Sequence, residues 1–371
     1  MITRRALGAT ALGATALGAT ALGATALGAT LAARQAKAEG PTKVTAGYPT
    51  VVRDIMGAYY TSVPKALFWN DEGLDVTIIG FPGANAAAEA LEVGRVDVAL
   101  MTNSATLTLL DKFPGSGAVV VYTFANGFTA LPAVRQDSPL HFIRELAGKQ
   151  VGVQNLANSQ VQVVKALMKL DGGDPASLRF IPIGEGVEEA HAVATNRVDA
   201  LALFDGAYAQ IESEGIPLRE LQGQTFDPST IGFMSGGLTR KDFLAAHRDI
   251  VVGFYRGIAK GTLFAHINPV ASVRIHWAQY PDLKPRNVPD DEAMRRSLMQ
   301  VNARLRNVFP VDGLIGNSSA AQIDAFQTLL LEGGIIRHKL DPASFWRSDV
   351  IREINDFDHA TVEQQARAWQ G

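Results

Sequence analysis

Polar and aromatic side chains in this sequence gather where short apolar runs end and helix-length segments begin. The polar segment 102–104 follows the apolar run 97–101, and Phe124 and Asn126 follow the run 118–123. The first backbone N–H groups of a helix have no partner inside it, so they bind anions and polar acceptors that lie just beyond the helix N-terminus. Side chains at such positions therefore predict a site that holds a small polar molecule.

Catalytic and metal chemistry has little support in the composition. The chain has no cysteine, which excludes disulfides, thiolate metal sites, cysteine nucleophiles and a lipid-modified N-terminal cysteine. None of its seven histidines lies three or four residues from another, as a helical pair of metal ligands requires. The sequence has neither a Walker-type phosphate loop nor a Gly-x-Ser-x-Gly nucleophile turn. We expect no cofactor, no metal and no catalytic residue.

The charge balance argues against nucleic acid as a partner. The chain has a formal net charge of −3, but residues 1–38 carry four basic residues and no acidic one, which leaves the rest at −7. A nucleic-acid-binding protein needs a basic surface. With 19% charged and 47% hydrophobic residues, the composition is that of an ordinary globular protein.

The elements that position the polar segments alternate along the chain from residue 43 onward. Short apolar runs typical of buried strands lie at 43–46, 75–79, 97–101, 118–123, 150–153, 178–183 and 199–204. Segments with apolar residues at helical spacing lie between some of these runs, at 85–93, 159–170 and 187–195. Strands that alternate with helices predict parallel βαβ units with helices on both faces, so the expected fold class is α/β.

A repeat at an offset of 102 residues indicates two similar α/β lobes. Residues 90–100 align with 192–202, and each block has a helix ending at a residue that tolerates a left-handed backbone (Gly94, Asn196), then Arg-Val-Asp, then an apolar strand. Chance similarity within a common α/β pattern is the alternative.

Past Leu238 the pattern changes to long helical segments. They lie at 240–265, 269–279, 291–305 and 318–331. A run of helices without strands predicts a C-terminal extension that packs around one lobe and contributes little to the chemistry.

The first 38 residues have the composition of an export signal. Residues 3–5 (Thr-Arg-Arg) precede five copies of Ala-Leu-Gly-Ala-Thr at 6–30, and a small-residue exit follows at 36–38 (Ala-Lys-Ala). These are the three parts of a signal peptide, and the Thr-Arg-Arg start is similar to the twin-arginine class. An uncleaved membrane anchor is the alternative, although its many glycines and threonines make it weakly hydrophobic. We expect 1–38 to be a cleavable twin-arginine-type signal peptide and the mature protein to be periplasmic.

Seven short phrases between residues 40 and 210 carry a family resemblance. They are Ala46-Gly47-Tyr48, Asp71-Glu72-Gly73-Leu74-Asp75-Val76, Phe81-Pro82-Gly83, Val93-Gly94-Arg95-Val96-Asp97-Val98, Asp137-Ser138, Leu146-Ala147-Gly148-Lys149-Gln150-Val151-Gly152-Val153 and Arg197-Val198-Asp199-Ala200. In this order they resemble the substrate-binding proteins of ABC importers for nitrate, aliphatic sulfonates, taurine and thiamine-pyrimidine precursors, the NMT1/SsuA-like family.

The resemblance implies the α/β fold of type II periplasmic binding proteins, in which two α/β lobes joined by two hinge crossovers enclose a ligand cleft, with a helical C-terminal extension here. On that template, lobe one comprises 42–128 plus 235–371 and lobe two comprises 135–225. The hinges lie near 129–134 and 226–234.

In such folds ligands bind beyond the carboxyl ends of the strands. The strand-end segments of the two lobes, together with one aromatic residue expected as a cleft wall, supply the candidate ligand-binding residues. These are Tyr48, Tyr59, Gly83, Asn85, Thr102, Asn103, Ser104, Phe124, Asn126, Asn158, Ser159, Gln160, Glu185 and Asp205.

Several candidates have a purely structural alternative. Asn85 and Ser159 are suited to capping a helix, and glycines are suited to turns with positive φ. Tyr59, the expected cleft wall, lies among aromatic residues at helical spacing, which usually pack in a core.

Asp205 is the strongest candidate, because 204–209 resembles an aromatic-Asp-Pro-Tyr stretch of the sulfonate-binding members, although Gly206 replaces the proline. Tyr48 comes next, since the resemblance places the aromatic residue of a Gly-Tyr phrase at the cleft.

We therefore expect a non-catalytic, monomeric receptor that closes its lobes on a small organic molecule and delivers it to the permease and ATPase subunits of an ABC importer. One alternative is an enzyme on the same fold, although the fungal thiamine-pyrimidine synthase of this superfamily relies on a cysteine-rich iron motif. Another is a sensory binding protein without a transport role.

The ionisable residues of the strand-end segments bear on the ligand. The segments are 48–53, 83–85, 102–104, 124–126, 155–160, 184–186 and 204–206. They contain one base, Arg53, and two acids, Glu185 and Asp205. An unpaired Asp205 favours a ligand that donates hydrogen bonds, such as a nitrogen heterocycle, over an alkyl sulfonate.

Overall fold

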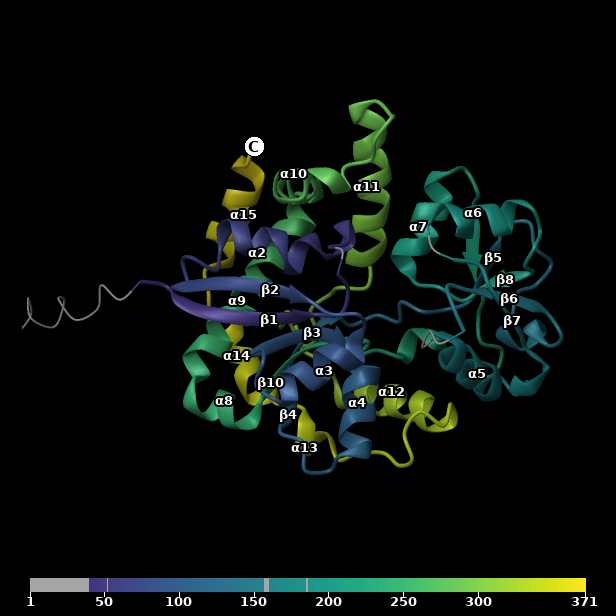
Figure 1. The fold of residues 1–371 in the computed structure, drawn as a ribbon, viewed down its shortest axis with the longest axis horizontal. Helices are drawn as coiled ribbons and strands as arrows, with labels where there is room; N and C mark the ends of the chain where they lie inside the picture. Colours follow the sequence, from purple (N-terminus) through teal and green to yellow (C-terminus); the bar gives the residue numbers. More distant parts are fainter. Residues whose placement is uncertain (1–39, 52, 157–159, 185) are drawn as a thin grey trace, which may run out of the picture. The chain divides into compact units, whose positions relative to one another are not determined.

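The computed structural model describes residues 40–51, 53–156, 160–184 and 186–371. The segment 1–38, which we interpret as an export signal, lies outside the described residues. Within the described part, no helix combines the length and the apolar character needed to cross a membrane. Residues 41–371 form two α/β lobes, each built on one five-stranded sheet (Figure 1).

The first sheet has the strand order β2-β1-β3-β10-β4. Its strands are β1 (Thr42–Tyr48), β2 (Leu74–Gly80), β3 (Val98–Thr102), β4 (Ala118–Ala125) and β10 (Ser235–Arg240). β1 pairs in parallel with β2 and β3, whereas β10 runs antiparallel to both β3 and β4.

The second sheet has the strand order β7-β6-β8-β5-β9. Its strands are β5 (Ala133–Arg135), β6 (Gln150–Val153), β7 (Arg179–Pro182), β8 (Ala200–Leu201) and β9 (Leu218–Glu220). β6 pairs in parallel with β7 and β8, and β5 runs antiparallel to β8 and β9. The two sheets therefore have the same topology, and in each the antiparallel strand comes directly after the chain crosses from the other sheet.

Helices cover both sheets. Those before the last strand are η1 (Ile55–Tyr60), α2 (Ser62–Leu67), α3 (Ala84–Glu92), α4 (Asn103–Lys112), η2 (Ile143–Leu146), α5 (Gln160–Leu170), η3 (Pro175–Ser177), α6 (Val187–Ala194), α7 (Asp205–Ser213) and η4 (Pro228–Thr230). Those after it are α8 (Lys241–Ala246), α9 (Arg248–Ile267), α10 (Pro269–Gln279), η5 (Pro281–Leu283), α11 (Asp290–Leu305), α12 (Ala320–Glu332), α13 (Pro342–Phe345), η6 (Ser348–Val350), α14 (Ile351–Ile354) and α15 (His359–Ala368).

The α/β fold class and the two-lobed organisation predicted from the sequence are confirmed. The strand order β2-β1-β3 in one lobe matches β7-β6-β8 in the other, as the 102-residue offset requires. Gly94 and Asn196, which follow α3 and α6, both adopt positive φ, at 71° and 52°. Each ends its helix in the left-handed conformation that the repeat predicts.

The predicted parallel βαβ units are present in both sheets, but each sheet also has one strand, β10 or β5, that runs antiparallel to its neighbours and that the sequence analysis did not predict. β5 and β9 have three residues each, too few to show a period of two. β10 begins with Ser235-Gly236-Gly237, which is typical of a turn in sequence. Packing requires these glycines, since a Cβ at Gly237 would lie 2.1 Å from the Tyr255 ring of α9. The single helix expected at 240–265 is likewise two helices, with a break at His247.

The C-terminal helices contact both lobes, which corrects the expectation that they wrap only one. α12 packs on α5, and α11 packs on α7 and on η1 (Figure 1). These contacts bring residues far along the sequence to the space between the two sheets.

Candidate functional site

One cavity of about 230 Å³ receives side chains from both lobes and from the C-terminal helices. It lies where the carboxyl ends of the parallel strands of both sheets meet, as the α/β pattern predicts. The lining residues are Tyr48, Pro49, Thr50, Asp54, Met56, Tyr60, Met101, Thr102, Ser104, Phe124, Thr129, Gln160, Val163, Phe204, Met234, Ser235, Arg304 and Phe326. We call this space the interlobe cavity.

Three aromatic rings form the lobe-one side of the interlobe cavity. The ring of Tyr60 stacks on Phe124 with centroids 4.5 Å apart, and Tyr48 stacks on Tyr60 at 6.0 Å. The hydroxyl oxygens of Tyr48 and Tyr60 lie 3.0 Å apart and share a hydrogen bond. Burial raises the pKa of Tyr60 to about 12, so this phenol is neutral at physiological pH. The wall is therefore aromatic and uncharged.

Tyr59, expected as a cleft wall, does not line the interlobe cavity, and its neighbour Tyr60 does. The Tyr59 side chain is buried, and its hydroxyl donates a hydrogen bond to the backbone carbonyl of Phe124. In the 3₁₀ turn of η1, adjacent side chains point about a third of a turn apart, so only one of the two can face the cavity. Tyr59 therefore packs in the core, which is the alternative that the sequence analysis gave for it.

The principal charged groups of the site form an ion pair between the lobes. Arg304 of α11 binds Asp205 of α7: its Nε donates to Oδ2 at 2.8 Å and its Nη2 to Oδ1 at 2.6 Å. Asn307 and the backbone N–H of Gly206 donate to the same carboxylate at 3.2 Å and 2.8 Å. Both side chains of the pair are less than a tenth exposed. Burial alone would lower the pKa of Arg304, but the carboxylate of Asp205 outweighs it and the pKa is raised.

This pair corrects two expectations. Asp205 is not an unpaired carboxylate waiting for a hydrogen-bond donor, because Arg304 and Asn307 already satisfy it. A ligand that donates hydrogen bonds is therefore not required at Asp205. The strand-end segments also do not contain every ionisable group of the site, since Arg304 lies in the C-terminal helices that we expected to contribute little to the chemistry.

A sequence signal for Arg304 did exist. In α11 the buried positions include Ser297 and Val301, and Arg304 follows at the next step of the same helical stripe. A basic residue on the buried stripe of a helix needs a carboxylate partner. The partner lies 99 residues away, and no periodic pattern points to it.

The close packing of Met56 explains why a glycine, Gly206, stands where the family stretch has a proline. A Cβ at this position would lie 2.5 Å from the sulfur of Met56, which belongs to lobe one. The glycine lets the Met56 side chain approach α7 closely, so the residue that departs from the family pattern lies at a contact between the lobes.

Seven other candidates line cavities at the ends of the strands. Tyr48, Thr102, Ser104, Phe124 and Gln160 line the interlobe cavity itself. Gly83 and Asn85 line an adjoining cavity of about 550 Å³. The adjoining cavity shares Thr102 and Ser104 with the interlobe cavity, so the two spaces have one wall in common.

Asn85 does not cap its helix. α3 begins at Ala84, with Gly83 in the capping position at a φ of 109° and no side-chain cap. The Asn85 side chain instead lies in the wall of the adjoining cavity. The capping alternative for this residue is therefore wrong.

Asn103 and Asn126 lie away from the interlobe cavity. Asn103 is fully buried, and its Nδ2 donates to the carbonyl of Phe233 at 2.9 Å. Asn126 is buried as well, and its Nδ2 donates to the carbonyl of Asn317 at 2.5 Å. Asn103 thus joins the start of α4 to the residues before β10, and Asn126 joins the end of β4 to the residues before α12. Both contacts are structural. The remaining candidates, Asn158, Ser159 and Glu185, lie outside the described residues.

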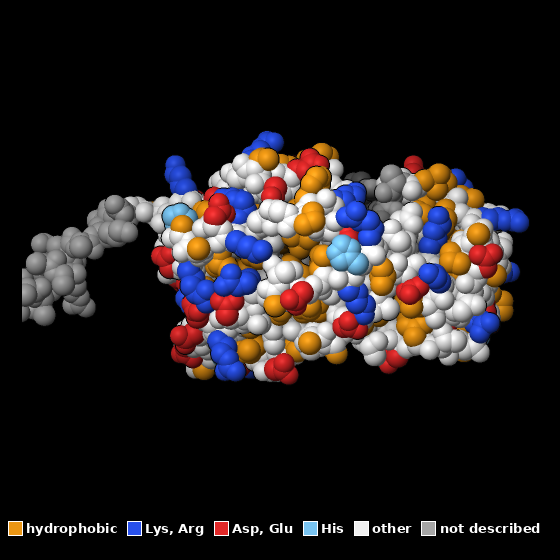
Figure 2. Space-filling model, turned by 90° about the horizontal axis from the view of Figure 1, so that it is seen from below, with side chains coloured by type: hydrophobic (Ala, Val, Ile, Leu, Met, Phe, Trp, Pro, Cys, Tyr) orange, Lys and Arg blue, Asp and Glu red, His pale blue; other side chains and the backbone are white. Residues whose placement is uncertain are grey.

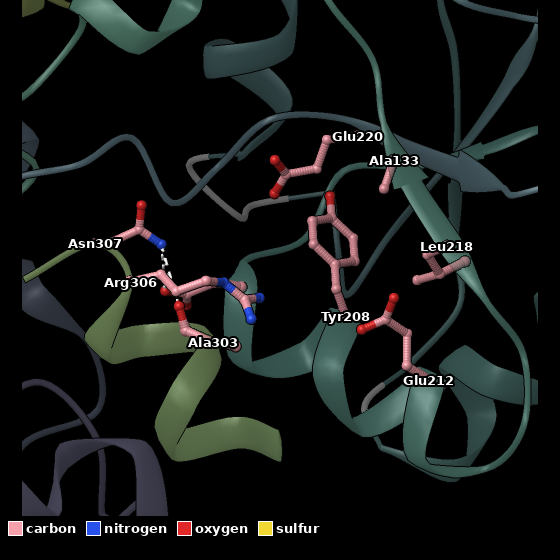
Figure 3. Close-up of a pocket in the computed structure, with 9 residues that line it drawn as sticks. Ala133, Tyr208, Glu212, Leu218, Glu220, Ala303, Arg306 and Asn307 are labelled. Atoms are coloured by element: carbon pink, nitrogen blue, oxygen red, sulfur yellow. Dashed lines mark hydrogen bonds between the residues drawn. The ribbon is translucent and has the colours of Figure 1, made fainter. Parts of the chain in front are cut away.

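A separate cavity of about 190 Å³ lies on the other side of the ion pair, with Asp205 and Asn307 in its wall. Figure 3 shows Arg306 and Asn307 on the α11 side of this cavity, and Tyr208, Glu212 and Glu220 on the side of lobe two. The Arg304–Asp205 pair therefore forms part of the partition between this cavity and the interlobe cavity.

Possible metal ligands and the surface charge are two further features of the part of the chain that the structure describes. No group of three or more His, Asp or Glu residues there is arranged to hold a metal ion. On the face drawn in Figure 2, Lys and Arg side chains are interspersed with Asp and Glu rather than gathered into one basic field.

Comparisons with known proteins agree with this architecture. A family model described as NMT1/THI5 like matches residues 58–272, which is more than half of the 371-residue chain. No curated protein matches the sequence.

Solved structures with the same fold include sulfonate-binding proteins. The alkanesulfonate-binding protein SsuA from Xanthomonas axonopodis pv. citri, bound to MOPS, superposes with a TM-score of 0.58 at 19% identity, over 84% of this chain and 100% of that one. The periplasmic aliphatic sulphonate-binding protein SsuA from Escherichia coli gives a TM-score of 0.60 at 16% identity, over 83% of this chain and 92% of that one.

An enzyme shares the fold too. The desulfurization enzyme DszB, solved as a cysteine-to-serine mutant in complex with biphenyl-2-sulfinic acid, superposes with a TM-score of 0.54 at 12% identity, over 85% of this chain and 99% of that one. At these identities the similarities establish the fold alone.

Proposed function

We propose that this chain, which belongs to the NMT1/THI5-like family, is the periplasmic solute-binding receptor of an ABC importer. The observation that carries the proposal is the interlobe cavity, whose walls come from both lobes and from α11 and α12. A molecule held there contacts both lobes at once. Only a ligand that binds the closed arrangement better than the open one can shift the equilibrium between them, and a shared cavity provides that difference.

The site residues that we propose are those that line the interlobe cavity and face a bound molecule from both sides. From lobe one they are Tyr48, Tyr60 and Phe124, and from lobe two Gln160 and Phe204. The lobes would rotate about the two segments that connect the sheets, between β4 and β5 and between β9 and β10.

The experiment has two parts. Mass spectrometry of small molecules released from the denatured, purified protein identifies what it carries. Small-angle scattering then compares the stripped protein with and without that molecule. A fall in the radius of gyration supports a clamp, whereas a ligand that binds tightly without compaction contradicts it.

An enzyme is the second candidate, and the observation that favours it is the fold shared with DszB. This chain contains no cysteine, so any turnover must use another nucleophile. The interlobe cavity has no histidine in its described lining, and its two ionisable groups of opposite charge are Asp54 and Arg304. Recovery of the bound molecule unchanged after prolonged incubation separates a receptor from an enzyme.

Export by the twin-arginine route is part of the proposal. It rests on Thr3-Arg4-Arg5 and the weakly apolar run that follows. Replacing both arginines with lysine should leave the precursor in the cytoplasm, while normal processing of that variant would indicate the general secretory route. Delivery to a permease and its ATPase subunits is tested by uptake of the identified molecule in cells that lack the receptor.

A further inference from the structure

The interlobe cavity has a size and a lining that restrict what it can hold. Its volume is about 230 Å³, and an apolar cavity of about 150 Å³ is large enough to bind benzene. The space therefore fits a molecule of one substituted ring or two small rings.

Aromatic and thioether side chains dominate the apolar part of this lining. Five aromatic residues and three methionines take part: Tyr48, Tyr60, Phe124, Phe204, Phe326, Met56, Met101 and Met234. Aromatic rings and polarisable sulfur both interact favourably with the faces and edges of another aromatic ring. An alkyl chain gains burial in such a cavity but none of these ring contacts.

The electrostatics of the cavity do not favour a full negative charge. Among its described lining residues, Arg304 is the only lysine or arginine, and Asp205 neutralises it through two hydrogen bonds. Asp54 adds an acidic group to the same lining. An anion entering the cavity would meet a balanced ion pair rather than an available lysine or arginine, so the side chains supply no net positive charge to replace its hydration.

Arg304 still has one donor group to offer. Its Nε and Nη2 are used on Asp205, and within the described residues no hydrogen bond involves its Nη1. Asp205 accepts two parallel hydrogen bonds from the Nε–Nη2 edge of the guanidinium, and this fixes the plane of the group. Since Arg304 lines the interlobe cavity, Nη1 is the donor group that it has left for a molecule held there.

We propose that the interlobe cavity selects an uncharged aromatic molecule that carries a hydrogen-bond acceptor, and that Arg304, held by Asp205, is the residue that recognises this acceptor through Nη1. The inference rests on the proposed receptor function and narrows it to a substrate class. It also separates this chain from the sulfonate-binding proteins that share its fold.

Four probes test the class by isothermal titration at millimolar concentration. Benzamide has the ring and the neutral acceptor, cyclohexanecarboxamide keeps the acceptor without the ring, benzoate keeps the ring with a negative charge, and ethanesulfonate has neither ring nor neutral acceptor. The proposal expects benzamide to bind most tightly. Equal or tighter binding of any of the other three, or no binding of benzamide, overturns it.

The Asp205→Asn variant tests the role of the ion pair. It leaves the charge of Arg304 uncompensated, so benzoate should gain at least about tenfold in affinity, as expected for a charge-assisted contact. Benzamide should change by much less, because it carries no charge. The matched control is Asp137→Asn, which alters an exposed Arg135–Asp137 pair by the same substitution and should leave all four affinities unchanged.

If Asp205→Asn does not fold, Tyr60→Leu tests the proposal on the aromatic side. It removes the ring that stacks on Phe124 and should weaken benzamide while sparing cyclohexanecarboxamide. Equal loss for both probes overturns the aromatic selection. Binding of ethanesulfonate with compaction, but not of benzamide, would overturn this inference and leave the proposed receptor function standing.

Discussion

The C-terminal helices contact lobe two at two places, and the two contacts differ in chemistry. α12 packs on α5 mainly through buried apolar side chains, with one exposed ion pair at the edge, whereas α11 packs on α7 through buried and exposed ion pairs and hydrogen bonds. Both contacts join the same two lobes, so they show what each kind of interaction contributes to the arrangement.

The α12–α5 contact is close and mostly apolar, and its one ion pair, Lys169–Glu332, is exposed at the edge. Val163 and Leu167 of α5 belong to the same buried cluster as Leu329 and Leu330 of α12. Just after α12, Gly333 approaches α5 so closely that a Cβ there would lie 2.9 Å from the Cβ of Ala166. Burial of apolar surface is not directional, so this contact stabilises the packing of the two helices without fixing one orientation.

The α11–α7 contact is directional. The Arg304–Asp205 pair needs two parallel hydrogen bonds, and beside it Arg296 pairs with Glu214 while Arg295 donates to the carbonyl of Ser213. A buried ion pair contributes little net stability compared with apolar residues of the same volume, because both charges lose their hydration. We infer that the apolar contact supplies stability and the ionic contact supplies a defined geometry.

The largest effect is expected when the ionic contact is broken on one side only. Arg304→Met leaves the carboxylate of Asp205 buried without its cation, and this should lower the free energy of unfolding by about 3–5 kcal/mol. Urea denaturation measures the loss.

The paired variant separates the two contributions. Arg304→Met combined with Asp205→Leu removes both charges, and it should recover most of the stability while losing the defined geometry. If Arg304→Met alone is as stable as the unmodified protein, the carboxylate of Asp205 must be hydrated in that variant. The contact would then not be buried in solution.

An intermediate effect is expected when the apolar contact is overfilled. Gly333→Leu places a side chain just after α12, where a Cβ would already lie 2.9 Å from the Cβ of Ala166 in α5, and it should cost about 1–3 kcal/mol of unfolding free energy. The loss should depend little on salt, because the added side chain is apolar and the Lys169–Glu332 ion pair at this contact is exposed and contributes little. Gly115→Leu is the control, since nothing lies within 4 Å of a Cβ at that position. If Gly333→Leu and Gly115→Leu lose the same unfolding free energy, the close approach of Gly333 to α5 is not the cause of the loss.

Local patterns in the sequence predicted much of the fold. β1, β2, β4 and β6 coincide closely with apolar runs, and the left-handed conformation of Gly94 and Asn196 follows from a repeated helix ending. Hydrophobic periodicity and turn chemistry act over a few residues, so a single sequence carries them. β5, β9 and β10 were missed because they are too short or too rich in glycine to show a period.

The site was only partly predictable for a related reason. Tyr48, Phe124 and Gln160 line the interlobe cavity because each lies at the end of a strand or the start of a helix, which is a local property. The choice between Tyr59 and Tyr60 depends on how η1 is rotated against its neighbours, and the Arg304–Asp205 pair depends on two helices meeting across 99 residues. Neither is encoded in local spacing.

The smallest effect is expected at the edge of the ionic contact. Arg296 pairs with Glu214 of lobe two and with Glu292 on its own helix, and the three side chains are 25%, 41% and 28% exposed, so water weakens both attractions. Arg296→Gln should therefore cost only about 0.2–1 kcal/mol of unfolding free energy, as exposed pairs do. Raising the ionic strength from about 0.1 M to 1 M shortens the screening length from about 10 Å to 3 Å and should remove most of that difference. The buried Arg304–Asp205 pair is screened far less, so the loss caused by Arg304→Met should persist at high salt. If both losses disappeared together, the ion pairs would form one exposed network, and the distinction between a buried pair that fixes geometry and a peripheral pair that adds little would be wrong.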